Sequence, residues 1–261
     1  MTRAAGLVAV CGLALALNGC GDPSEPASNT MPVVVTALAA PRSGAAVADP
    51  AVGATTAAAR PITYPRSGSG NWKIARRTGA IAGDSGPLLR YQIALERDIT
   101  GITAGQFAAT VEQTLGDSRS WIGQGDVRLQ RVGPHRPHDF TIYLATPATR
   151  DQLCGDAARG AVDGYTSCHN GDRVVLNVAR WTHGVPSYGA PLTTYRQYMI
   201  NHETGHQLGH HHELCSGEGR LAPVMEQQTL GRHGCRPNPW PTLKGRAYHG
   251  RPGQYNDPIP A

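Results

Sequence analysis

The sequence predicts an α+β fold with a mixed β-sheet, and three observations lead to this prediction. Stretches that alternate strictly between apolar and polar or small residues are typical of β-strands, and several of them occur in the chain. Other stretches place apolar residues at fourfold spacing, as helices do. The 32 Gly and 20 Pro among 261 residues exclude an all-helical bundle. All aromatic residues except Tyr64 follow residue 70, so we expect the fold in residues 71–261.

The first predicted strand covers residues 89–95. Its apolar members alternate with Arg90, Gln92 and Ala94, which is the pattern of a half-buried strand. Residues 140–144 repeat this alternation. Residues 127–132 and 174–178 are further strand candidates.

Two helices are expected between and after these strands. Thr103 and Gln106 have the spacing of a capping box, and Phe107, Val111 and Leu115 follow at fourfold spacing up to Gly116. A second helix is predicted from about Pro191, a favourable residue in a first helical turn, to Leu208.

The N-terminal residues 1–20 have the pattern of an export signal. Their apolar run is short for a membrane span, and it ends in Leu17-Asn18-Gly19-Cys20, which resembles the lipobox of bacterial lipoproteins. That resemblance implies lipidation of Cys20 and a location on the outer face of the cell membrane, with ordinary secretion as the alternative. Residues 21–70 are rich in Ala, Pro, Ser and Thr, and they predict a disordered tether.

The charge pattern gives little support to a nucleic-acid partner. The formal net charge is +5, but 24 basic residues are dispersed without blocks of like charge. We therefore expect no nucleic-acid partner. We also expect a monomer that contacts a membrane only through the lipid anchor.

Four cysteines remain after the export segment, and an exported chain meets an oxidising compartment. Their proximity in the sequence favours the pairs Cys154–Cys168 and Cys215–Cys235 among three possible pairings. Each bridge is expected to stabilise the fold by roughly 3 kcal/mol. A zinc site built from cysteines is the weaker interpretation, because no CxxC pair occurs.

The second predicted helix carries the residues that indicate chemistry. His202 and His206 lie one turn apart on one face, so both imidazoles can bind one metal ion, and Glu203 lies beside them. This is the geometry of a hydrolytic zinc site, in which a carboxylate takes a proton from water. Gly209 can end the helix at positive φ and bring back a third ligand, for which His212 has the right distance.

The motif HExxHxxGxxH and the following Met225 resemble the signature of the metzincin metallopeptidases. The segments 118–121, 164–168, 175–181, 195–198, 222–225 and 238–241 resemble more closely an actinobacterial family of exported proteins with a domain of unknown function. This resemblance implies a mixed sheet over the active-site helix, one catalytic Zn²⁺ and a cleft for peptides. It also implies His202, His206 and His212 as ligands, Glu203 as general base and Met225 as the Met-turn. Gln227 stands where many metzincins have a tyrosine.

Several alternatives remain open. His210 or His211 could replace His212 as the third ligand, and Glu226 could do so as in gluzincins. His169 and His183 are expected to be surface or loop histidines.

The leading hypothesis is an extracytoplasmic zinc endopeptidase acting on a peptide or protein substrate in the cell envelope or outside it. An extended peptide is expected along the strand formed by residues 173–178. The alternatives are a noncatalytic metal-binding or envelope-binding module, and an amidase for a nonpeptide envelope substrate.

Overall fold

The computed structural model describes residues 60–76, 78–156 and 164–260, which belong to one folded unit. The predicted export signal, Cys20 and the tether up to residue 59 lie outside the described residues. The strands that build the main sheet are β1 (Trp72–Ile74), β2 (Ile81–Ala82), β3 (Leu88–Glu96), β4 (Arg128–Arg131), β5 (Phe140–Ala145), β6 (Cys168–Asn170) and β7 (Arg173–Asn177). The α-helices are α1 (Ala104–Leu115), α2 (Pro147–Cys154), α3 (Val178–His183) and α4 (Leu192–Gln207).

The main sheet is mixed, as predicted. Its strand order is β2-β4-β3-β5-β7-β6, and β1 pairs with the C-terminal part of β3. The four central strands β4, β3, β5 and β7 are parallel, whereas β2 and β6 run antiparallel at the two ends. The edge strand β6 is therefore the antiparallel neighbour of β7.

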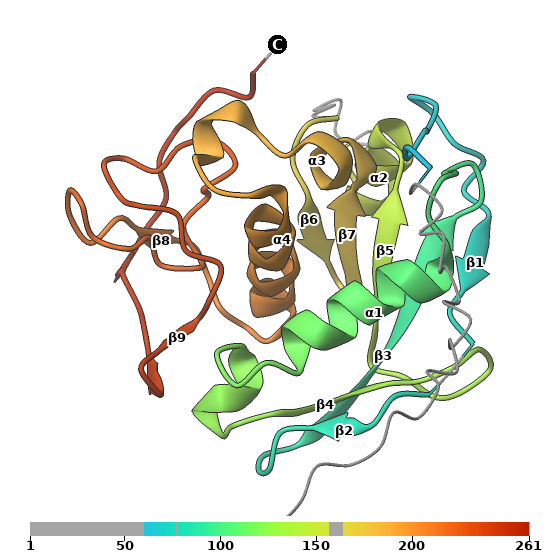
Figure 1. Ribbon diagram of the computed structural model, residues 1–261, viewed down its shortest axis with the longest axis horizontal. Coiled ribbons are helices and arrows are strands. Elements are labelled where there is room, and N and C mark those ends of the chain that lie inside the picture. Colours follow the sequence, from blue (N-terminus) through green and yellow to red (C-terminus); the bar gives the residue numbers. More distant parts are fainter. Residues whose placement is uncertain (1–59, 77, 157–163, 261) are drawn as a thin grey trace, which may run out of the picture. The chain divides into compact units, whose positions relative to one another are not determined.

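The two faces of the sheet are covered by different elements. Phe140, Ile142 and Leu144 of β5 pack into the main core with α1, α3 and α4, and Figure 1 shows α1 and α4 on the same side of the sheet. A smaller cluster on the opposite face joins the end of α2 to β5 and β7. Because both faces are covered, Gln92, Ala94 and Glu96 of β3 are buried, and the prediction of a half-buried strand was wrong there.

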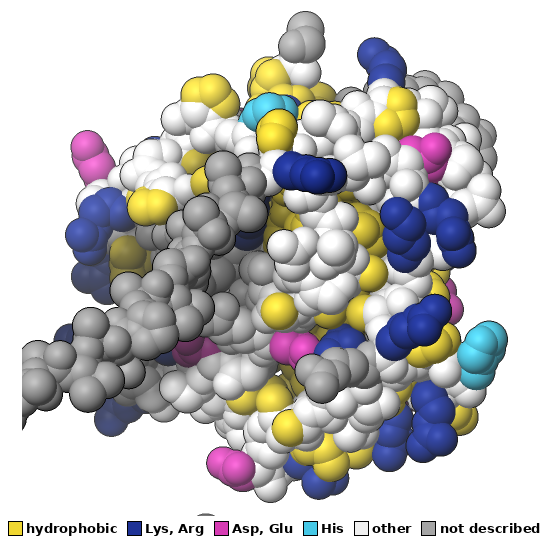
Figure 2. Space-filling view, turned by 45° about the vertical axis from the view of Figure 1, so that its right-hand side comes forward, with side chains coloured by type: hydrophobic (Ala, Val, Ile, Leu, Met, Phe, Trp, Pro, Cys, Tyr) yellow, Lys and Arg dark blue, Asp and Glu magenta, His cyan; other side chains and the backbone are white. Residues whose placement is uncertain are grey.

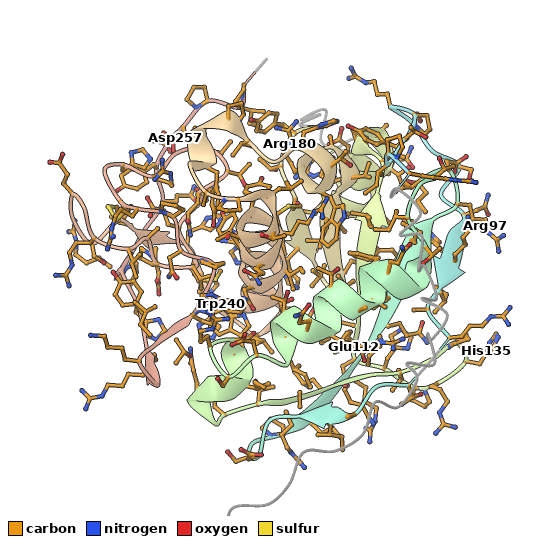
Figure 3. The ribbon with its side chains drawn as sticks, in the orientation of Figure 1. Arg97, Glu112, His135, Arg180, Trp240 and Asp257 are labelled. Atoms are coloured by element: carbon orange, nitrogen blue, oxygen red, sulfur yellow. A yellow bond between two sulfur atoms is a disulfide. The ribbon has the colours of Figure 1, made fainter. Side chains whose placement is uncertain are left out.

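Helix α1 begins and ends where its sequence signals predicted. The side chain of Thr103 accepts a hydrogen bond from the Gln106 backbone and completes a capping box, and Gly116 is the C-cap. Glu112 on this helix pairs with the buried Arg131 of β4 at 2.9 Å (Figure 3). This ion pair links α1 to the sheet in addition to the apolar contacts.

Residues 60–70 belong to the folded domain, so the prediction that the tether extends to residue 70 was wrong. Ile62 and Tyr64 pack against the core, and Glu96 accepts a hydrogen bond from the backbone of Gly70 at 3.0 Å. The fully buried Glu96 also accepts bonds from the Thr146 backbone and the Thr149 hydroxyl, both at 2.7 Å. A low apolar content does not prevent ordering when a buried carboxylate binds the backbone.

Both predicted disulfides are present. Cys154–Cys168 joins the end of α2 to β6, and Cys215–Cys235 joins two loops that follow α4. The linked cysteines are 14 and 20 residues apart in the chain.

The chain after α4 contains only short strands. They are β8 (Glu213–Leu214), β9 (Thr242–Leu243), β10 (Arg246–Ala247) and β11 (Arg251–Pro252), paired as β8 with β11 and β9 with β10. Figure 1 shows this C-terminal region beside α4, on the side away from β5. Residues near the C-terminus therefore lie close to the end of α4.

The surface carries dispersed basic side chains. On the face shown in Figure 2, Lys and Arg side chains form separate groups among polar and hydrophobic atoms. Among the described residues, no helix has the length and apolar character required to cross a membrane.

Candidate metal centre

The end of α4 turns the chain back toward the helix. Helix α4 ends at Gln207, and Gly209 has a φ of +91°. The backbone N–H of His210 donates to the carbonyl of Gly205 at 2.9 Å, and that of Gly209 donates to His206 at 3.0 Å. These two bonds form a Schellman motif, which requires a left-handed residue directly after the C-cap, where glycine is best suited. The predicted reversal after Gly209 is present.

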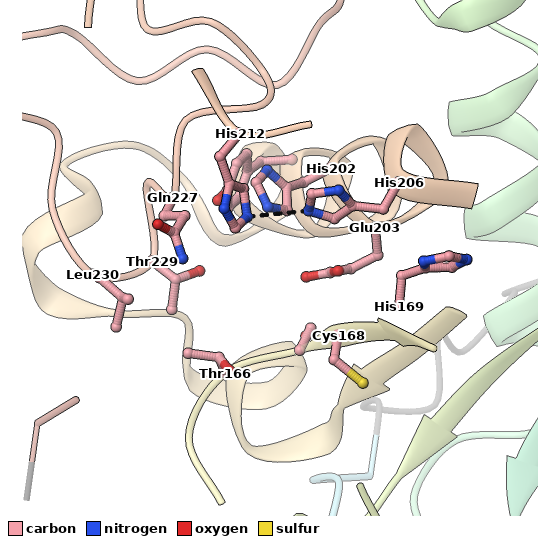
Figure 4. A pocket seen from close by; sticks show the side chains of 12 residues that line it. Thr166, Cys168, His169, His202, Glu203, His206, His212, Gln227, Thr229 and Leu230 are labelled. Atoms are coloured by element: carbon pink, nitrogen blue, oxygen red, sulfur yellow. Dashed lines mark hydrogen bonds between the residues drawn. The ribbon is translucent and has the colours of Figure 1, made fainter. Parts of the chain in front are cut away.

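This reversal brings three imidazoles together, two from α4 and one from the following segment. One ring nitrogen each of His202, His206 and His212 lies within 4.8 Å of the others. Figure 4 shows the three rings facing one another above the pocket. The structure therefore joins the three histidines that the sequence singled out.

Each imidazole uses its Nδ1 atom to donate a hydrogen bond to an oxygen. His202 donates to the carbonyl of Val224 at 2.8 Å, and His206 donates to the carbonyl of His210 at 2.9 Å. His212 donates to the Oε1 atom of Gln254 at 2.9 Å. In a neutral imidazole these bonds leave Nε2 without a proton on all three rings.

The Nε2 atoms are arranged in a way that fits a cation. Those of His206 and His212 are 3.1 Å apart, and two lone pairs at this distance repel each other unless a positive charge lies beside them. Two nitrogens bound to one tetrahedral zinc ion are about 3.3 Å apart. Three neutral imidazoles, each oriented by the hydrogen bond of its Nδ1 atom, are thus a donor set suited to Zn²⁺.

The environment also keeps the three rings neutral. Burial, followed by the neighbouring His206 and His212, holds the pKa of His202 well below its usual value. Burial lowers the pKa of His206 to about 4 and also lowers the pKa of His212. Metal ligands must be deprotonated, so at neutral pH no proton has to leave these rings before a metal ion binds.

Glu203 lies beside the three imidazoles in a cavity of about 320 Å³. It is largely buried, and Figure 4 shows its carboxylate pointing into the space below the imidazoles. The cavity is also lined by Tyr198, Thr166, Ser167, Gln227, Thr229 and Leu230. These residues provide hydroxyl, amide and apolar groups. The volume of the cavity is in the range of small-ligand sites.

Met225 packs against α4 at Gly205. A Cβ atom at Gly205 would lie 2.5 Å from the Met225 sulfur and 2.6 Å from a ring carbon of Trp121. The carbonyl of Val224 binds His202, so the segment that contains Met225 contacts α4 by both backbone and side chain. The close approach depends on the missing side chain of Gly205.

The alternative third ligands lie elsewhere. His210 stacks on Trp121 with ring centroids 4.2 Å apart, and His211 is exposed. The carboxylate of Glu226 groups with the sulfurs of Cys215 and Cys235, which form a disulfide, rather than with the histidines. His212 is therefore the residue that completes the group.

His169 is on the edge strand β6, is half-buried, lines the cavity and contacts Gln207 at 3.2 Å, and it is not part of the ligand group. This agrees with the expectation of a surface histidine outside the ligand set. The expectation of a free strand edge for a peptide was wrong. Strand β7 lies between β5 and β6, so the expected free edge at residues 173–178 is covered. Within the described part of the chain, the outer edge of β6 pairs with no further strand.

The sequence reasoning also missed the oxygen atoms that orient the ligands. Two of them are backbone carbonyls, which any residue provides, and the third belongs to Gln254, 42 residues after His212. No local pattern signals any of the three.

The fold and the site together define a mixed α/β domain with a solvent-accessible group of three histidines and one glutamate. The chain belongs to the family described as "Protein of unknown function (DUF3152)", whose model matches residues 59–242. No curated protein and no solved structure gives a significant match.

Proposed function

We propose that this domain is an extracytoplasmic zinc-dependent endopeptidase of the metzincin type. The observation that carries the proposal is the convergence of three Nε2 atoms beside Glu203 in an accessible cavity. Three neutral nitrogen ligands and an open side are typical of catalytic rather than structural zinc. Met225 is assigned as the Met-turn, on the basis of its contact with α4 between His202 and His206.

The bound metal would be held by His202, His206 and His212. When bound, Zn²⁺ supplies a positive charge that polarises a substrate carbonyl and makes water more acidic. The hydrogen bonds that the ligand rings donate to Val224, His210 and Gln254 keep these rings in the required tautomer and orientation.

Glu203 would act as general base and then as general acid. Its carboxylate takes a proton from the attacking water and delivers it to the nitrogen of the leaving amine. Glu203 follows His202 directly on α4, so the helix fixes the base relative to two of the ligands. The rigid helix thus provides the geometry that proton transfer requires.

The peptide would bind to β6 rather than to β7. The outer edge of β6 offers backbone groups for an added strand, and residues 166–169 line the cavity. One substrate side chain would enter the cavity toward Thr229 and Leu230. The disulfide Cys154–Cys168 fixes the first residue of this strand to α2.

The proposed location is outside the cytoplasm. Two disulfides in the structure support an oxidising compartment. The export signal and the lipid anchor at Cys20 rest on the sequence, and labelling of Cys20 with a fatty-acid analogue tests the anchor.

The test of the activity is cleavage of a diverse peptide library, read by mass spectrometry. The zinc-loaded full chain is compared with Glu203→Gln, which keeps the size of the side chain but cannot accept a proton as a base. We expect the parent to cleave peptides and the variant to be slower by about 10²–10⁴-fold while binding one zinc ion.

Equal cleavage by the parent and Glu203→Gln would contradict the role of Glu203. Absence of cleavage by a zinc-loaded parent would contradict the peptidase and lead to tests of envelope amides and of metal or polymer binding.

A further inference from the structure

We propose that residues 249–257, here called the C-terminal strap, form part of the metal centre, and that Gln254 is a positioning residue for His212. The metal ion itself rests on the proposed function, but the orientation of His212 does not. The strap lies beyond residues 59–242, which the family model matches.

The three ligands differ in what orients them. His202 and His206 donate to the backbone carbonyls of Val224 and His210, in segments that follow α4. His212 follows the helix, is partly exposed, and donates to the side chain of Gln254. Of the three hydrogen bonds made by Nδ1, this is the one that a side-chain substitution removes without altering a ligand.

The strap is held next to His212 by backbone pairing. In the β8–β11 pair, Arg251 is opposite Leu214 and Pro252 is opposite Glu213. The backbone N–H of Gly253 donates to the carbonyl of His212 at 3.0 Å, and that of Gly250 donates to the Glu213 carboxylate at 2.9 Å. Gln254 therefore follows a residue that is itself bonded to His212.

Gly253 allows this approach. Its φ is +145°, and a Cβ atom there would lie 3.1 Å from the side chain of Leu214. Any other residue would be strained in this conformation and crowded against β8. The turn at Gly253 thus brings the side chain of Gln254 within hydrogen-bond distance of the His212 Nδ1 atom.

The far end of the strap is fixed to the loop that follows Met225. Asp257, labelled in Figure 3, accepts a hydrogen bond from His233 at 2.9 Å, and Tyr255 stacks on the same imidazole. With both ends attached, the backbone of the strap holds the exposed Gln254 next to His212. A partner of this kind raises the affinity of a histidine for metal by fixing its tautomer and orientation.

The experiment compares Gln254→Leu, Gln254→Glu and Asn256→Leu in the full chain. Asn256 is an exposed amide on the same strap and is the matched control. Zinc affinity is measured by competition with a chelator. The tautomer of His212 is read from ¹H–¹⁵N spectra of the imidazoles in the metal-free protein.

We expect Gln254→Leu to weaken zinc binding by about 10- to 100-fold and to remove the preference of His212 for a proton on Nδ1. Gln254→Glu keeps an oxygen acceptor, so it should retain both properties, and Asn256→Leu should match the parent.

Two results would overturn the proposal: unchanged zinc affinity and tautomer in Gln254→Leu, or an equal loss in Asn256→Leu. Peptide cleavage is not part of this readout, so failure of the proposed peptidase leaves the assignment of Gln254 intact. If the parent binds no zinc, the tautomer of His212 in the metal-free protein still decides whether Gln254 positions this ring.

Discussion

At the scale of single residues, Glu226 is a buried acid outside the histidine group. Its side chain is fully buried, and neither carboxylate oxygen has a hydrogen-bond partner among the described residues. Burial raises the pKa of Glu226 to about 8. The folded protein therefore keeps this group protonated at pH values where an unfolded chain would release the proton.

This difference predicts a loss of stability at high pH. Between about pH 5 and pH 8 the folded state holds a proton that the unfolded state has lost, so the free energy of unfolding falls as pH rises. Each pKa unit corresponds to about 1.4 kcal/mol, and the total is a few kcal/mol at most. Urea unfolding of metal-free Glu226→Gln at several pH values should show a smaller decrease than the parent.

The matched control is Glu218→Gln. Glu218 lies between Cys215 and Cys235, as Glu226 does, but its side chain is exposed. Identical pH dependence of the parent and Glu226→Gln would show that Glu226 does not cause the decrease.

At the scale of elements, α4 combines ligand, base and packing surface in one helix. His202, Glu203 and His206 face the cavity, while Asn201 binds Ser120 at 2.7 Å and the carbonyl of Pro239 at 2.8 Å. The buried polar contacts of Asn201 fix the helix to two loops, and this fixes the position of the adjacent ligand.

The contact of α4 with Met225 predicts the effect of Gly205→Ala. Helix propensity alone would stabilise the protein by about 1 kcal/mol. The new Cβ atom would meet Met225 and Trp121, so we expect a net loss of about 1–3 kcal/mol in the free energy of unfolding. Denaturant unfolding of the metal-free protein measures the difference.

Gly105→Ala in α1 is the control, since the nearest atom to its Cβ would be 3.9 Å away. This variant should be as stable as the parent or slightly more stable. A stabilising Gly205→Ala would contradict the close approach of Met225.

At the scale of the whole molecule, the folded domain begins before residue 71. Gly68 donates to the hydroxyl of Thr146 at 2.9 Å, and Ser69 donates to Asp98 at 2.9 Å. Together with Gly70 and Glu96, these bonds hold the N-terminal segment against the ends of β3 and β5. Removing the segment would take away one hydrogen-bond donor each from the buried Glu96 and the buried Thr146.

Two truncations test this boundary. A chain that starts at Arg60 should keep the melting temperature of the full chain. One that starts at Asn71 should melt several degrees lower, because about 1 kcal/mol corresponds to 2–4 °C in a domain of this size. Equal melting temperatures of the two truncations, measured by calorimetry, would show that residues 60–70 contribute no stability.

Local sequence patterns were sufficient for much of the fold. The predicted helices at 103–116 and 191–208 match α1 and α4, and the alternating residues at 89–95 and 140–144 lie in β3 and β5. Short strands such as β1, β2 and β6 have three residues or fewer, which is too short for a periodic pattern. Helix α2 was missed because it buries Thr149, Arg150 and Asp151 rather than an apolar face.

The sequence by itself determined that His202, Glu203 and His206 share one helix and that Gly209 reverses the chain, and it favoured the cysteine pairs that the structure contains. These features depend on spacing between residues that are near one another in the chain, where helical geometry and loop closure act. Only the tertiary structure decided that β6 rather than β7 is the edge strand beside the cavity among the described residues, that His169 lines the cavity, and that Gln254 orients His212. Those relations depend on strand order and on the path of loops over tens of residues, which local preferences do not specify.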